Sequence, residues 1–128
     1  MRTDFKAEPF KIAVPDVVLD DLKARLARPR WPIEAKAGKW HYGTDLAYMR
    51  KVVDHWLSRY DWRHWEARLN AFPQYKAEIG GPNGEKKKVH FILERGSGDN
   101  PLPRLITHGW PGSVAEFIEI IAPLAHPE

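Results

Sequence analysis

The stretch Leu105-Ile106-Thr107-His108-Gly109-Trp110-Pro111-Gly112-Ser113 carries the clearest structural signal in the chain. The short apolar run Arg104–Thr107 predicts a strand, and a turn rich in glycine and proline follows it. Ser113 and Glu116 have the spacing of a capping box, so we expect a helix over Ser113–Ala125. Glycine lets a backbone amide approach a ligand closely, and a preorganised amide suits a developing oxyanion. The segment is therefore either an anion-binding turn or a plain connection between a strand and a helix.

The residues before this segment predict a β-hairpin. Polar and apolar side chains alternate from Tyr75 to Ile79, which is typical of a half-buried strand. Gly80-Gly81-Pro82-Asn83-Gly84 is a strong turn signal, and Val89–Leu93 predicts the returning strand. We therefore expect a hairpin over about Tyr75–Leu93.

The first 73 residues predict helices and loops, with no strand. A helix is expected to open at Val14-Pro15-Asp16 and to end at Pro29, and its apolar residues recur three and four apart: Leu19, Leu22 and Leu26. We expect Thr44 to cap a second helix with an apolar face of Leu46, Met49, Val53, Trp56, Leu57 and Tyr60. Asp61 is expected to cap a third, with Trp62, Trp65 and Leu69. The stretch 33–43 has no period and predicts a loop.

Composition excludes several classes of protein. With 128 residues, 43% of them apolar and 29% charged, the chain is that of a globular protein. It has no cysteine, which excludes disulfide frameworks, thiolate nucleophiles and thiolate metal sites. The net charge is only +3, and we interpret the basic run Lys86–Lys88 as a solvated turn, so no nucleic acid is expected as a partner. No stretch approaches the roughly 20 apolar residues that span a bilayer, and Met1–Lys6 lacks the apolar core of a signal peptide. We expect a soluble, cytoplasmic protein.

The other titratable and aromatic residues favour structural roles. His55 and His64 stand nine apart, whereas helical metal ligands commonly stand four apart, so no metal site is predicted. Surface or packing roles are expected for the remaining isolated histidines His41, His90 and His126, and a solvated helix face for Asp20 and Asp21. We interpret the tryptophans as packing residues rather than as a ligand cage: Trp31, Trp40, Trp56, Trp62 and Trp65.

The segment His108–Ser113, continued by Glu116-Phe117, resembles the oxyanion loop of microsomal and juvenile-hormone epoxide hydrolases, which belong to the α/β-hydrolase superfamily. It does not resemble the glycine-run version of lipases and esterases. The likeness extends from about Pro9 to Leu124, and it rests on the order of many short matches. These are Pro9-Phe10, Val14-Pro15, Leu22, Leu26, Arg30-Trp31-Pro32, Trp40, Tyr42-Gly43, Leu46, Trp56, Tyr60-Asp61-Trp62-Arg63, Glu66, Leu69-Asn70, Phe72-Pro73 and His90-Phe91. The hairpin turn Gly81–Lys87 is longer and more basic than the resemblance implies.

The resemblance implies an α/β fold that is incomplete in these residues. Residues 1–73 would form the N-terminal helical meander of an epoxide hydrolase. Residues 74–128 would form the first hairpin, the oxyanion-loop strand and the first helix of an α/β-hydrolase domain. The N-terminal segment would wrap the hydrolase domain and its lid.

The resemblance also implies a reaction, the hydrolysis of an epoxide to a vicinal diol without cofactor or metal. The Trp110 backbone N–H would be one donor of the oxyanion hole, and the Trp110 ring would line the epoxide pocket. Pro111, through a cis bond to Trp110, would shape the loop with Gly109 and Gly112, and His108 would hold it without acting as a base. The nucleophilic Asp, the lid Tyr residues and the catalytic His come later in the family sequence, so none is assigned here. Two alternatives stay open: a non-catalytic stand-alone or assembly domain, and another α/β-hydrolase such as a dehalogenase.

In an α/β-hydrolase sheet, a further strand lies between the second hairpin strand and the strand of the oxyanion loop. Without it, we expect unpaired edges along Val89–Leu93 and Leu105–Thr107, and large apolar patches. The chain would then self-associate through these edges or lie against the remainder of its hydrolase. A third outcome is direct pairing of Arg104–Thr107 with Val89–Leu93.

Overall fold

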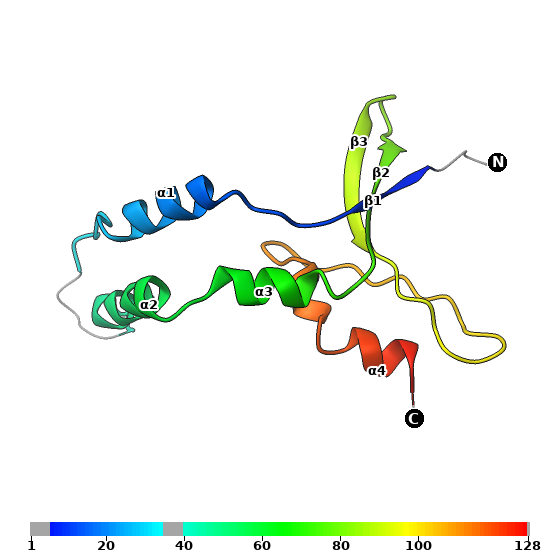
Figure 1. Ribbon diagram of the computed structural model, residues 1–128. Helices are drawn as coiled ribbons and strands as arrows, with labels where there is room; N and C mark the ends of the chain where they lie inside the picture. Colours follow the sequence, from blue (N-terminus) through cyan, green and yellow to red (C-terminus); the bar gives the residue numbers. More distant parts are fainter. Residues whose placement is uncertain (1–5, 35–39, 128) are drawn as a thin grey trace. The chain divides into compact units, whose positions relative to one another are not determined.

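The computed structural model describes residues 6–34 and 40–127, which contain five α- or 3-10 helices and three strands (Figure 1). They form two compact units. One holds the residues up to Ile12 together with those from Arg63 onward, and the other is Ala13–Trp62. The predicted division of the sequence near residue 73 stays a prediction. None of the described helices is both long enough and apolar enough to cross a bilayer.

Helix α1 (Asp16–Leu26) of the second unit begins where the sequence predicts. Pro15 is its N-cap residue and has extended backbone angles. Asp16 places a carboxylate in the first turn, where its negative charge interacts favourably with the helix dipole. The predicted apolar residues Leu19, Leu22 and Leu26 are half-buried, whereas their neighbours are exposed. Asp21 forms an ion pair with Arg25 at 2.8 Å, in keeping with a solvated face.

The N-cap residue of helix α2 (Leu46–Ser58) lies one residue later than the sequence predicts. Asp45, not Thr44, is the N-cap, and its Oδ1 accepts the Tyr48 N–H at 2.8 Å. A side chain at the N-cap position is the one that reaches the amides of the first turn, and Thr44 lies one residue too early to do so. The half-buried face contains Leu46, Met49, Val53 and Leu57, as predicted, but Trp56 and Tyr60 are 41% and 38% exposed.

Aromatic side chains of this unit form small local clusters. The Arg50 guanidinium lies 4.9 Å from the centre of the Trp31 ring, and the rings of Trp40 and Tyr48 are 5.2 Å apart. Trp40 is 58% exposed, so its ring is only partly packed. In the predicted loop 33–43, Ile33, Glu34 and the residues from Trp40 onward are irregular or turn, and residues 35–39 lie outside the described residues.

A three-stranded antiparallel sheet, in the order β1-β2-β3, organises the first unit (Figure 1). Strands β2 (Gln74–Gly80) and β3 (Lys86–Ile92) confirm the predicted hairpin. Strand β1 (Ala7–Phe10) shows that the expectation of no strand before residue 73 was wrong. This strand is short and contains Pro9, which is tolerated at a sheet edge because its missing N–H breaks no ladder there. Its pairing is with a strand far along the chain, so no local pattern indicates it.

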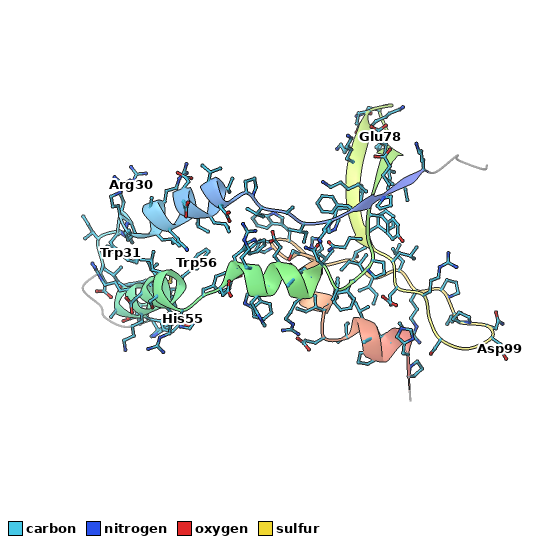
Figure 2. All side chains as sticks on the ribbon, in the orientation of Figure 1. Arg30, Trp31, His55, Trp56, Glu78 and Asp99 are labelled. Carbon is cyan, nitrogen blue, oxygen red and sulfur yellow. The ribbon has the colours of Figure 1, made fainter. Side chains whose placement is uncertain are left out.

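The hairpin turn places the basic run on a strand. The Gly81 N–H donates to the Glu85 carbonyl at 2.7 Å, and Gly84 has a φ of 78°, which glycine adopts without strain. The basic run Lys86–Lys88 therefore forms the first residues of β3. The sequence-based interpretation, which placed this run in the turn, was wrong on that point. These lysines are exposed as expected, and Lys86 pairs with Glu78, labelled in Figure 2, at 3.8 Å.

Few described side chains are fully covered. Leu69, at the end of α3 (Trp62–Leu69), and Ala77 of β2 are the buried apolar residues among those described, at 9% and 3% exposure. Tyr75 and Phe91 face each other across the hairpin with ring centres 5.7 Å apart. Many large apolar side chains remain exposed in both units, and those after β3 include Leu93, Leu102, Leu105, Ile106 and Trp110.

Two predicted elements near the C-terminal end need correction. Residues 104–107 form no strand, because a strand requires a paired neighbour and β3 pairs only with β2 in the described sheet. Direct pairing of Arg104–Thr107 with Val89–Leu93, the third of the outcomes that the sequence left open, is thus not observed. The predicted single helix is a 3-10 turn, η1 (Val114–Phe117), followed by α4 (Ile121–Ala125). Pro123 explains the break: it is tolerated in the first turn of α4, whereas inside one continuous helix it would remove a hydrogen bond and clash with the preceding turn.

Candidate oxyanion loop

Residues His108–Ser113 form a tight turn at the end of a long irregular segment that follows β3 (Figure 1). The Gly112 N–H donates to the Gly109 carbonyl at 2.8 Å, which closes the turn. The Trp110-Pro111 peptide bond is cis, as the resemblance implied. The His108 Nδ1 lies 2.8 Å from the Gly109 carbonyl oxygen, so the ring contacts the loop itself.

The loop continues directly into a capped helical turn. The Ala115 N–H donates to Ser113 Oγ at 3.3 Å, and the Ser113 N–H donates to Glu116 Oε1 at 3.2 Å. These reciprocal bonds are the predicted capping box. A Cβ on Gly112 would overlap the Glu116 carboxylate and would lie 2.8 Å from the Gly109 carbonyl oxygen. Glycine at position 112 is therefore required by the close approach of Glu116 and Gly109.

The predicted site residues lie together, and they are open to solvent. Every residue from Pro101 to Pro111 is exposed, and the Trp110 side chain is 96% exposed. The backbone of Trp110 lies inside the closed turn between Gly109 and Gly112. An amide in such a turn is held by the covalent geometry around it, and an open position leaves it accessible to a ligand.

Several contacts connect the segment that follows the loop to the rest of its unit. The Ser97 N–H donates to the Ala125 carbonyl at 2.8 Å, and His126 Nε2 lies 3.3 Å from Glu94 Oε1. Arg68 of α3 forms an ion pair with Glu119, between η1 and α4. The Arg68 guanidinium also lies over the Trp65 ring, 5.0 Å from its centre. The region C-terminal to the loop is thus anchored to α3 and to the residues after β3.

Among residues 6–34 and 40–127 there is no cluster of three or more His, Asp or Glu side chains that would hold a metal ion. His55 lies on α2 (Figure 2), and His64 lies on α3, where its ring meets that of Trp65 edge-on at 5.5 Å.

A buried network of side-chain amides is the polar feature that sequence reasoning missed. Gln74 is 4% exposed, and its Nε2 donates to the Leu69 carbonyl at 2.9 Å and to Asn70 Oδ1 at 3.1 Å. Asn70 in turn holds both backbone groups of Ile12: its Oδ1 accepts the Ile12 N–H at 2.9 Å, and its Nδ2 donates to the Ile12 carbonyl at 2.8 Å. The side chain of Asn70 therefore acts as one further pairing partner for the segment that follows β1.

His90 completes this network. Its Nε2 lies 2.8 Å from Gln74 Oε1. Because the Gln74 amide nitrogen already serves two acceptors, its oxygen must face the histidine, so Nε2 carries the proton and donates. Burial lowers the pKa of the His90 imidazole below its ordinary value, and the positive charge of Lys76 lowers it further. The register of the hairpin places His90 opposite Lys76.

The profile of the family described as "Epoxide hydrolase N terminus" matches residues 7–117. A putative epoxide hydrolase of Stigmatella aurantiaca is 46% identical over 119 residues, which cover 93% of this chain and 26% of that protein. Juvenile hormone epoxide hydrolase 2 of Ctenocephalides felis is 36% identical over 126 residues, covering 98% of this chain and 27% of its own length.

Solved structures of epoxide hydrolases also resemble this chain. The epoxide hydrolase of Aspergillus niger superposes with a TM-score of 0.78 at 33% identity, over 91% of this chain and 30% of that one. The juvenile hormone epoxide hydrolase of Bombyx mori has a TM-score of 0.77 at 28% identity, over 93% of this chain and 28% of the other. The predicted α/β class is confirmed by this match to epoxide hydrolases. The chain spans about a quarter of the length of the curated relatives it matches.

Proposed function

Because the chain belongs to the epoxide hydrolase N-terminus family, we propose that it is the N-terminal part of an enzyme that converts an epoxide and water to a vicinal diol. The carrying observation is that the family match over residues 7–117 includes the closed turn at Gly109–Gly112. The relatives are named epoxide hydrolases, which favours this reaction over a dehalogenase or a non-catalytic domain.

The reaction would proceed through an aspartyl ester. A carboxylate oxygen attacks an epoxide carbon, the ring C–O bond breaks, and a tyrosine hydroxyl protonates the released oxygen. A histidine then takes a proton from water as its oxygen attacks the ester carbonyl. The resulting oxyanion collapses, the acyl C–O bond breaks, and the protonated histidine gives its proton to the departing oxygen, so the diol leaves with the oxygen that the carboxylate supplied. The proton of the new carboxylic acid restores the tyrosine hydroxyl.

In this scheme the loop serves the second step. The Trp110 N–H donates to the oxyanion of the tetrahedral intermediate, and the Trp110 ring contacts the substrate. The capping box and the Gly112-to-Gly109 bond fix the direction of that amide, and His108 supports the Gly109 carbonyl. A donor that is already oriented needs no reorganisation as charge develops. The nucleophile, the lid tyrosines and the histidine base belong to the part of the family sequence beyond these residues, so the substrate and the remaining hydrolase domain are the partners of this chain.

A single turnover in water enriched in oxygen-18 tests the proposal. The complete protein is used in excess over styrene oxide. We expect the first diol to contain no heavy oxygen, because its new oxygen comes from the carboxylate, and the protein to gain one oxygen-18 atom. A diol labelled in the first turnover would contradict the ester intermediate, and no diol would contradict the function.

The 128-residue chain by itself is expected to self-associate. Strand β3 has no partner on its outer side in the described sheet, and Leu105 and Trp110 are 92% and 96% exposed. Sedimentation velocity should show a growing share of oligomer with concentration. Val89→Lys, a charge on the β3 edge, should reduce it, whereas Ile33→Lys, at a fully exposed site in the other unit, should not. A sharp monomer at all concentrations would contradict this expectation.

A further inference from the structure

The segment from Ala7 to Ile12 is held by a set of contacts distinct from the oxyanion loop. Its backbone pairs with β2, its Phe10 ring lies against His90 with centres 5.2 Å apart, and the Lys76 Nζ lies 3.6 Å from the centre of the Phe10 ring. Beyond Phe10, Asn70 holds both backbone groups of Ile12. We name Phe10, Ile12, Asn70, Gln74, Lys76 and His90 the N-terminal latch.

The hydrogen bonds of the latch form a connected series from His90 through Gln74 and Asn70 to Ile12. His90 donates to Gln74, Gln74 donates to Asn70, and Asn70 Oδ1 also accepts from Ile12. Every amide group of Gln74 and Asn70 in this chain has a partner, and Gln74 is buried. A buried network of this kind tolerates little change in any member, because a lost partner leaves another group unsatisfied.

We propose that His90 makes this latch sensitive to pH: the neutral imidazole keeps the segment Ala7–Ile12 docked on β2, and protonation of the ring favours its release. The observation that carries this proposal is the position of His90. It stands opposite Lys76 in the strand register and edge-on to the ring that Lys76 covers. A protonated ring would keep its bond to Gln74, so the cost of the charge is electrostatic and not a lost hydrogen bond.

The charged groups around His90 do not cancel that cost. Lys76 faces it from β2, and Lys88 lies two residues before it on the same face of β3. The carboxylates by register are Glu8 of β1, opposite Lys76, and Glu78 of β2, opposite Lys88. Glu8 lies 3.9 Å from Lys6, and Glu78 lies 3.8 Å from Lys86, so each faces a lysine of its own. The residue of this network that follows α3 is Asn70, which is uncharged and so does not offset the charge on His90. Separation of β1 would let water reach both His90 and Lys76.

The sign of the pH effect follows from the direction of the pKa shift. The pKa of docked His90 is lowered, by burial first and by Lys76 second, so the released state binds the proton more tightly. The contribution of neutral His90 to docking is fully present above the ordinary histidine value of about 6.5 and is lost as the pH falls through the lowered value.

Hydrogen exchange of the Ile12 amide tests the proposal, because this amide donates to Asn70 Oδ1 only while the segment is docked. The measurement uses the complete protein. After correction for intrinsic exchange rates, we expect the protection of this amide to fall at least about threefold from pH 7.5 to 5.5, while the β2–β3 ladder keeps its protection. His90→Gln retains a donor and does not titrate, so the fall should vanish. Lys76→Met, which removes the facing charge, should reduce it. His64→Gln, an exposed histidine of α3, should leave it unchanged.

Three results would overturn the proposal. Ile12 protection that is independent of pH in the unaltered chain would exclude the latch response. A fall of the same size in His90→Gln would assign it to another group. A parallel loss of protection in the β2–β3 ladder would mean that the whole unit unfolds. If His90→Gln does not fold, Lys76→Met decides, since an unchanged fall in that variant contradicts the role of the facing charge.

Discussion

The 128-residue chain, purified alone and incubated with styrene oxide, is expected to form diol no faster than buffer does. One oxyanion donor stabilises an ester intermediate only after a nucleophile has formed it, and the proposal places the nucleophile and the base in the remainder of the hydrolase. Enzymes accelerate their reactions by roughly a millionfold or more, so the difference from the complete protein is large. The measurement is diol formation by chromatography at equal molar concentrations of the chain and the complete protein.

The control for this experiment is protein purity. Diol formation by the chain that persists after repeated purification, at a constant ratio to chain concentration, would contradict the expectation. It would require a nucleophile among these residues, and the carboxylates near the loop, Glu116 and Glu119, would be the first to replace by Gln.

Local patterns in the sequence predict those elements whose cause is local. Alternating polar and apolar residues and a glycine-rich turn predict the hairpin Tyr75–Leu93, and strands β2 and β3 confirm it. The capping box of Ser113 and Glu116 is also confirmed, because both of its bonds join residues three or fewer apart. The cap of α2 was placed one residue early, since Thr44 and Asp45 are both good cap residues and only the backbone decides between them.

Elements that depend on distant partners could not be predicted from such patterns. β1 exists because β2 pairs with it and Asn70 holds Ile12, neither of which a local pattern contains. The apolar run at Arg104–Thr107 has the composition of a strand and lacks a paired neighbour in the described sheet, so it stays irregular and exposed. The resemblance predicts the His108–Ser113 loop, whereas no local pattern indicates its closure by the Gly112-to-Gly109 bond.

The second large effect is expected from Gly112→Ala in the complete protein. A Cβ at this position would overlap the Glu116 carboxylate and approach the Gly109 carbonyl oxygen to 2.8 Å, which is closer than side chains tolerate. Either Glu116 leaves the Ser113 N–H, or the Gly109–Gly112 turn opens, and both displace the Trp110 amide. Losing one oxyanion donor costs about a hundredfold to a thousandfold in rate and misplacing it can cost about a hundredfold, so we expect kcat to fall by about a hundredfold. The measurement is steady-state kinetics together with single-turnover analysis. In a single turnover the aspartyl ester should accumulate, because the variant slows its hydrolysis.

Two variants separate this cause from a general loss of folding. Gly80→Ala adds the same methyl group in β2, where the added Cβ meets nothing within 4 Å, so its kcat should remain near that of the unaltered protein. Glu116→Ala removes the carboxylate that Gly112→Ala displaces. The double variant should therefore lose less activity than the product of the two single losses, because residues in contact do not act independently. Fully multiplicative losses would show that the methyl group acts elsewhere, and a Gly112→Ala protein with unchanged kcat and normal ester turnover would remove the loop from the proposed mechanism.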